Sequence, residues 1–218
     1  RIFDILSTRL NSRDIHLLAI VLLLIWMANA GTAFLTALPL LIGGMVESLA
    51  MTVEIAGLMA ASHLSGAAFG ALICFFLTTQ TNYRALILLA LVLQVIGELF
   101  FIGNQSVMTL LITRFLSGTG AGLLCAVCYG VIAGMRYKDS IFAALLFGQM
   151  IFGFIWFYFW IDLVNSIGFR FSLVSLSLLG LPLLPFLKFL PAPIESSAGG
   201  YGRRSLPSLA GMLCILSL

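Results

Sequence analysis

Long apolar runs alternate with short polar stretches along most of the chain. A bilayer core is about 30 Å thick, and about 20 helical residues cross it. The short polar stretch at residues 103–106 predicts that the helices on either side of it are antiparallel. On this pattern we expect six membrane-spanning helices, near residues 16–42, 55–77, 85–102, 106–135, 141–163 and 171–190.

The first of these runs also fits a signal peptide, because Ala28-Asn29-Ala30 resembles a small-residue cleavage site. The apolar pattern continues through Leu41, so we favour a helix that is retained in the membrane.

The segments outside the six runs differ from them in composition. Residues 1–15 are polar with isolated apolar positions, which predicts a short cytoplasmic helix on the membrane surface. Residues 191–205 are rich in Pro, Gly and Ser, as in a linker. Residues 206–218 are apolar again but rise only about 20 Å as a helix. We therefore expect a truncated seventh helix in a piece of a longer chain.

The composition supports a chain whose solvent is lipid. Of the 218 residues, 61% are hydrophobic and 9% are charged, and the mean hydropathy is +1.16. Soluble domains carry about 25% charged residues. The predicted fold class is an all-α integral membrane protein, a six-transmembrane-helix bundle followed by the start of a seventh helix. Nothing in the composition supports nucleic-acid binding.

The positions of the basic residues predict the orientation. If the N-terminus lies inside, the basic residues of the loops are cytoplasmic, with Arg170 as the exception. Lys and Arg are enriched in short cytoplasmic loops of membrane proteins. We expect a multi-pass protein of the cell (inner or plasma) membrane with a cytoplasmic N-terminus and a cytoplasmic linker.

Small residues recur at every fourth position in two of the runs. The fourth run has Gly118, Gly122, Ala126 and Gly130, and the second has Ser62, Gly66 and Gly70. Residues four apart share one face of a helix, and small residues there allow close contact between membrane helices. The residues predicted to pack in this way are Gly66, Gly70, Gly118, Gly120, Gly122 and Gly130.

A few polar residues interrupt the apolar runs. Glu98 and Arg114 lie at similar distances on either side of the turn at residues 103–106, about 10 Å along their helices. We expect an ion pair, because a charge at membrane depth is costly unless it is paired or reached by water. His63 and Asn29 lie at comparable depth, so these four side chains could meet in one water-filled cavity.

Each polar residue also has a purely structural interpretation. Arg114 could be a lock between helices, and Glu98 could only neutralise it. His63 could be a packing residue, while Asn29 and Gln149 could form hydrogen bonds between helices. Asp162 is expected to be an interfacial cap that could pair with Arg170. The aromatic run 152–160 is expected to face lipid instead of forming a ligand cage.

Enzymatic chemistry has little support. The four cysteines lie in apolar runs, and Cys125-x-x-Cys128 has no second Cys or His pair near it. Ser117-Gly118 and His63 only superficially resemble an intramembrane hydrolase, since the Gly-x-Ser-Gly setting is absent. We expect no catalytic activity, no metal and no cofactor.

The fourth run resembles a known family motif. Its residues read L-x-x-x-R-x-x-S-G-x-G-A, from Leu110 through Arg114 to Ala121, which is similar to the fourth-helix motif of the major facilitator superfamily. Ser117 stands where that family often has Gln. Ala37-Leu38-Pro39 resembles a common first-helix ending, and six helices followed by a cytoplasmic connector match the first half of the family's plan. The fifth run lacks the Gly-Pro motif of many exporters of this family.

The resemblance implies a secondary transporter that works by alternating access. Two bundles would rock about a central site, and an ion gradient, commonly of protons, would drive a small solute. Arg114 would contact an anionic group or modulate Glu98, and Glu98, His63, Asn29 and Gln149 would lie on the transport or proton path. The implied partners are a small-molecule solute, for which Arg114 favours an anion, the coupling proton, the bilayer and a C-terminal six-helix half. The alternative is a six-helix membrane scaffold or regulatory protein that transports nothing.

Overall fold

A computed structural model describes residues 12–77, 82–135, 137–182 and 184–185, with side chains from Leu18 onward. Within these ranges the chain is all-helical. The helices are α2 (Ser12–Thr36), α3 (Leu38–Leu49), α4 (Val53–Leu77), α5 (Tyr83–Gly103), α6 (Val107–Ala133), α7 (Lys138–Ile167) and α8 (Phe169–Leu178). Five of them, α2, α4, α5, α6 and α7, are long and apolar enough to cross a membrane. The chain is therefore a helical bundle of the multi-pass membrane type.

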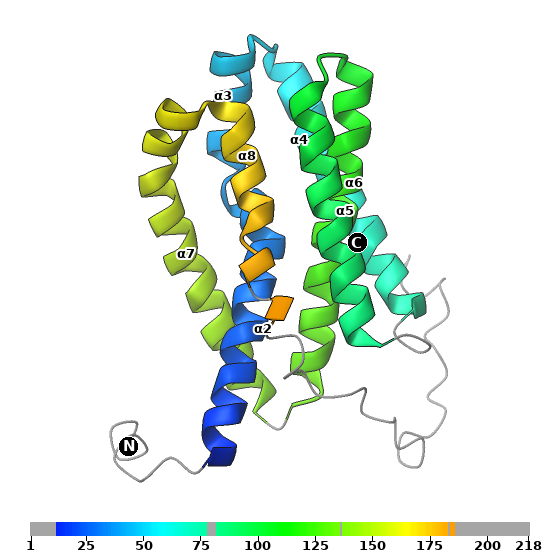
Figure 1. Cartoon of the computed structure of the whole chain (residues 1–218), viewed down its shortest axis with the longest axis vertical. Helices are drawn as coiled ribbons and strands as arrows, with labels where there is room; N and C mark the ends of the chain where they lie inside the picture. The colour runs from blue at the N-terminus through cyan, green and yellow to red at the C-terminus, as the bar shows by residue number, and fades with distance from the viewer. Residues whose placement is uncertain (1–11, 78–81, 136, 183, 186–218) are drawn as a thin grey trace, which may run out of the picture.

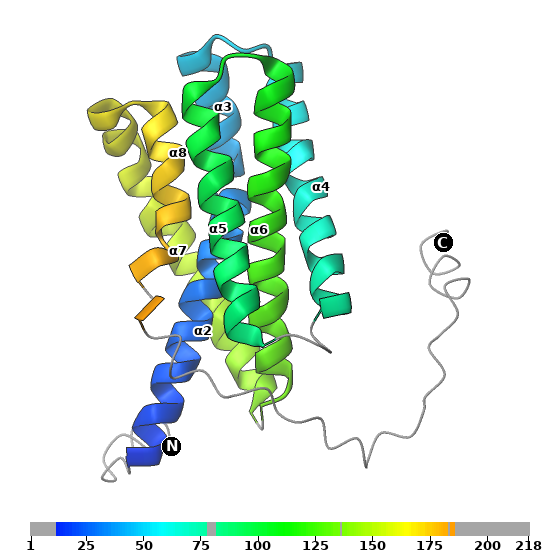
Figure 2. The same ribbon diagram turned by 45° about the vertical axis from the view of Figure 1, so that its right-hand side comes forward.

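The long helices run side by side, and α6 is the most enclosed of them (Figures 1 and 2). It packs against α4, α5 and α2, whereas α7 packs mainly on α2 and α8 lies between α7 and α5 (Figure 2). Of the most apolar stretch of α6, 67% is buried within the protein, against 11% for α7. The bundle is thus organised around α6.

The first apolar run is two helices instead of the single span predicted for residues 16–42. α2 ends at Thr36, and α3 begins at Leu38 with Pro39 in its first turn. Proline has no N–H to donate, and its ring crowds the carbonyl four residues earlier, so it is favoured only at the start of a helix. The residues that resemble a family helix ending therefore mark a break, after which α3 continues to Leu49.

The sixth predicted span, at residues 171–190, is also different. α8 has ten residues, which rise about 15 Å, and it ends at Leu178. Pro182 cannot donate a hydrogen bond to the Leu178 carbonyl, so the helix cannot continue unbroken through the predicted span. Of the surface helix expected at residues 1–15, residues 12–15 belong to α2, and the rest lies outside the described residues. Residues 186–190, the linker at 191–205 and the apolar run 206–218 also lie outside the described residues.

A polar layer separates two apolar clusters of the bundle. One cluster includes Leu91 of α5 and the other includes Phe101 of the same helix. Glu98 lies between these two residues in the chain, and Arg114 lies in the same way between cluster residues of α6. The charged side chains are therefore enclosed by apolar packing on both sides.

Candidate functional site

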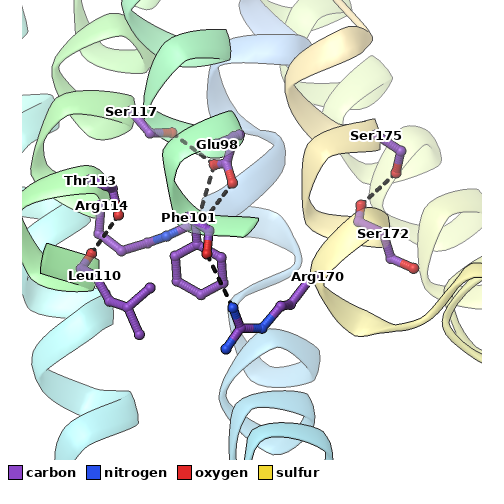
Figure 3. A network of polar contacts seen from close by, with 9 residues as sticks. All are labelled: Glu98, Phe101, Leu110, Thr113, Arg114, Ser117, Arg170, Ser172 and Ser175. Atoms are coloured by element: carbon purple, nitrogen blue, oxygen red, sulfur yellow. Dashed lines mark hydrogen bonds and ion pairs between the residues drawn. The ribbon is translucent and has the colours of Figure 1, made fainter. Parts of the chain in front are cut away.

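The ion pair predicted between Glu98 and Arg114 is present. Arg114 Nη1 donates to Glu98 Oε1 at 3.0 Å, and Nη2 donates to Oε2 and completes the ion pair (Figure 3). Ser117 Oγ, one turn along α6 from Arg114, donates to Glu98 Oε1 at 2.8 Å. Arg114 is 0% exposed and Glu98 is 3% exposed. The pair is neutral and joins α5 to α6 in two parallel charge-assisted hydrogen bonds.

Aromatic rings surround the rest of the guanidinium group. The ring centroids of Phe101 and Phe34 lie 4.0 Å and 5.5 Å from Arg114 Cζ. A cation within about 6 Å of a ring centroid is attracted by the ring. Phe34 in turn stacks on His63, with centroids 3.8 Å apart and planes at 25°. The rings therefore connect α2 and α4 to the ion pair.

Gly97 allows α5 to approach α6 at the ion pair. A Cβ atom on Gly97 would lie 2.6 Å from the backbone nitrogen of Ser117, which is closer than real side chains pack. The helices are thus in backbone contact one residue before Glu98. Sequence reasoning missed Gly97, although a glycine beside the single acidic residue of an apolar run was the available signal.

Five of the six glycines predicted to pack do so. A Cβ atom on Gly66 or Gly70 of α4 would overlap the backbone of α6 at Phe115 and Thr119. On α6, Gly118 and Gly122 face the backbone of α4, while Gly120 faces Ala90 of α5. The prediction is wrong for Gly130, where a Cβ atom meets nothing within 4 Å among the described residues. Gly130 is exposed near the end of α6.

Arg170 has a different role from the one predicted. Its Nη1 donates to the backbone oxygens of Ile102 and Asn104, each at 2.8 Å, and not to Asp162. Figure 3 shows its longer contact, of 3.5 Å, with the Phe101 carbonyl. These carbonyls lie at the C-terminal end of α5, where a helix leaves acceptors unpaired and favours positive charge. Arg170 therefore fastens α8 to α5. A basic residue at the start of an outer helix was the only sequence signal for this.

A cavity of about 350 Å³ lies between α2, α4 and α6. Its lining is mainly apolar and includes Thr32 of α2, His63 of α4 and Tyr129 of α6. Gln149 of α7 donates to Thr32 Oγ1 at 3.0 Å and to Tyr129 Oη at 3.4 Å. Gln149 thus joins the polar groups at this cavity and not the ion pair.

Asn29 does not join the other predicted site residues. Its Nδ2 donates to Ile25 O of its own helix at 2.8 Å, and its buried Oδ1 has no hydrogen-bond partner among the described residues. Of the four side chains expected to meet, Glu98, Arg114 and His63 are connected through Phe34, whereas Asn29 forms no hydrogen bond with them.

Comparison with known proteins gives no match, either to a protein-family model or to a curated protein. The assignment as a multi-pass membrane protein with an all-helical fold thus rests on the apolar helices and their packing. The candidate site rests on its own geometry. That geometry consists of a buried Glu98–Arg114 pair, the ring stack beside it and a separate cavity between three helices.

Proposed function

We propose that this chain forms one helical bundle of a secondary active transporter, which moves a small solute by alternating access. The supporting observation is the cavity between α2, α4 and α6, because it lies among membrane-spanning helices and has hydrogen-bonding groups at Thr32, His63 and Tyr129. Its volume of about 350 Å³ is within the range typical of small-molecule sites. In the proposed protein, a second six-helix bundle supplies the opposite wall of the solute path.

The ion pair offers a way to couple a proton to the solute. A proton on Glu98 removes the charge that neutralises Arg114 and leaves a buried cation that attracts an anionic solute. Loss of the proton restores the pair and favours solute release. Arg114 does not line the cavity, so an anion reaches it only if the Phe34–His63 stack moves aside. The Phe34–His63 stack is therefore the expected gate between the cavity and the Arg114 guanidinium group.

A scaffold or regulatory protein that transports nothing is the second candidate. It is favoured by the burial of the ion pair and by the three hydrogen bonds that Glu98 accepts, although the buried Arg114 Nε has no hydrogen-bond partner among the described residues. In this interpretation Glu98–Arg114 is only a lock between α5 and α6. The two candidates differ in whether a proton ever moves through the protein.

Proton flux in liposomes tests the proposal. The full-length protein is reconstituted with an entrapped pH-sensitive dye, and anionic, neutral and cationic solutes are added in turn. We expect at least one anionic solute to drive proton entry, Glu98→Gln to abolish the proton signal, and Asp139→Asn, an exposed site on α7, to leave it unchanged. A protein that folds and inserts normally but moves no proton with any solute would overturn the proposal.

A further inference from the structure

A second and larger cavity, of about 510 Å³, lies on the other side of the bundle, between α2, α7 and the end of α8. Three tryptophans line it: Trp26, Trp156 and Trp160. It shares no lining residue with the cavity between α2, α4 and α6. Its ligand is therefore a separate question from the solute of the proposed transporter.

The three tryptophans of this cavity differ in exposure, since Trp160 is buried, Trp156 is half-buried and Trp26 is exposed. Trp160 is 3% exposed, and its ring centroid lies 6.0 Å from that of Trp156 at an interplanar angle of 49°. The Trp26 N–H donates to the Leu179 carbonyl at 2.8 Å, which anchors this indole at the end of α8. The buried Trp156 N–H has no hydrogen-bond partner among the described residues. The three indole rings therefore line the cavity, together with the Trp156 N–H as a buried donor that has no described partner.

Among the described residues, one acidic residue and no basic residue line the cavity. The acidic residue is Asp162, whose carboxylate has no ion-pair or hydrogen-bond partner among the described residues. Arg170, the basic residue expected to pair with it, is occupied by the carbonyls of α5. The cavity therefore combines an unpaired negative charge with aromatic rings, and both attract organic cations.

The place of Asp162 along α7 brings it toward the membrane surface. The 30 residues of α7 rise about 45 Å, roughly 15 Å more than the bilayer core, and Asp162 lies five residues before the end at Ile167. In a centred helix its carboxylate lies near the boundary between hydrocarbon and headgroups, where water reaches it. The indoles of Trp26 and Trp156 extend the cavity toward the bilayer centre.

From this arrangement we propose that the cavity between α2, α7 and α8 is a binding site for a lipophilic organic cation of drug-like size. Asp162 supplies the countercharge, and the indoles of Trp26, Trp156 and Trp160 hold the apolar groups and the cationic centre. Most of the aromatic run of α7 is exposed, as expected for side chains that face lipid, whereas Trp160 is buried. The site stands independently of the proposed transport of a solute.

Two probes of the same shape and opposite charge test this site. Binding of tetraphenylphosphonium and of tetraphenylborate to the full-length protein in detergent micelles is followed by tryptophan fluorescence. We expect saturable binding of the cation and not of the anion. Loss of the countercharge in Asp162→Asn should weaken cation binding about tenfold, which corresponds to 1.4 kcal/mol.

Matched controls separate the site from general surface charge and from folding. Asp139→Asn removes an exposed carboxylate at the opposite end of α7 and should leave affinity unchanged. Trp156→Leu should weaken binding about fivefold through loss of a cation–π contact, whereas Phe154→Leu, on an exposed position of the same helix, should not. Asp162→Glu should bind like the wild type. Equal binding of both probes, equal effects of the two aspartate changes, or no saturable binding by folded protein would overturn the proposal.

Discussion

The two sides of this bundle are almost equally hydrophobic but are packed in different ways. The most apolar 18-residue stretch has a mean hydropathy of 1.7 in α6 and 1.9 in α7. Yet 67% of that stretch is buried within the protein in α6, and only 11% in α7. The α4–α6 contact is made by glycines and backbone, as at Gly66 and Gly122. The α7–α8 contact is made by large aromatic rings, such as Trp160 against Phe169 at 6.3 Å. Side-chain size, and not hydropathy, decides how closely these helices approach.

The difference has consequences for where polar chemistry can lie. Backbone contact between α4, α5 and α6 excludes lipid and water, so the buried charges of Glu98 and Arg114 must satisfy one another. Aromatic packing around α7 is less close and leaves the larger cavity, with Asp162 unpaired at its edge. We therefore expect the α4–α6 side to be a rigid unit and the α7–α8 side to adapt to ligands. The following predictions test this contrast, from the largest effect to the smallest.

The largest effect is expected for the ion pair. Arg114→Ala leaves the Glu98 carboxylate buried without its partner, and breaking a buried pair in this way costs about 3–5 kcal/mol. The double change with Glu98→Gln removes the stranded charge and should recover a large part of that loss. Thermal unfolding in micelles measures both variants. Equal destabilisation by the single and the double change would contradict the pairing as a stabilising contact.

The glycine contacts should give the next largest effect. A Cβ atom on Gly122 overlaps the Ala67 carbonyl of α4, so Gly122→Ala should destabilise the protein by about 3 kcal/mol. Gly130→Ala on the same helix meets no described atom within 4 Å and should be neutral or slightly stabilising. The same unfolding measurement compares the two. Similar effects at both positions would show that α4 and α6 are not in backbone contact.

A smaller effect is expected where α8 is fastened to α5. Arg170→Ala removes charged hydrogen bonds to Ile102 O and Asn104 O and should cost about 2 kcal/mol. Arg170→Lys keeps the charge and should recover part of the loss. Hydrogen exchange of the last turn of α5 gives the local readout and should increase in the alanine variant. Unchanged exchange there would contradict the assigned contact.

The smallest effect is expected on the aromatic side. Trp26→Phe keeps an apolar ring but loses the hydrogen bond to Leu179 O, which should cost about 1 kcal/mol. Phe154, which is 77% exposed, should tolerate replacement by Leu with no measurable change. If Trp26→Phe destabilised the protein as much as Gly122→Ala, the contrast between a rigid and an adaptable side would be lost.

Much of the fold could be predicted from the sequence, because long apolar runs and small-residue spacing act locally along one helix. The spans around α4, α5, α6 and α7 and the Glu98–Arg114 pair follow from such patterns and are confirmed. The break before Pro39 and the end of α8 before Pro182 were missed. Hydropathy alone does not show where a proline removes a backbone hydrogen bond from a helix.

Partners across helices were harder to predict. The apolar pattern gives only the depth in the membrane of residues such as Gln149, Arg170 and Asn29. Depth alone does not say which neighbouring helix each side chain faces. Gly130 shows the same limit, because it continues the spacing of small residues along α6 but faces no described atom within 4 Å. The cavity beside Asp162 depends on three helices at once and had no signal in the spacing of any one of them.

The most direct test of the proposed solute path is whether water enters the cavity between α2, α4 and α6. Leu64 and Ser65 are neighbours at the middle of α4, and both are exposed, but only Leu64 lines that cavity. In a background without the four native cysteines, Leu64→Cys and Ser65→Cys are treated in sealed vesicles with a membrane-impermeant thiol reagent. We predict that the cysteine at 64 is modified and the cysteine at 65, which faces lipid, is not. Modification of neither, or of both at equal rates, would contradict a water-filled path through this bundle.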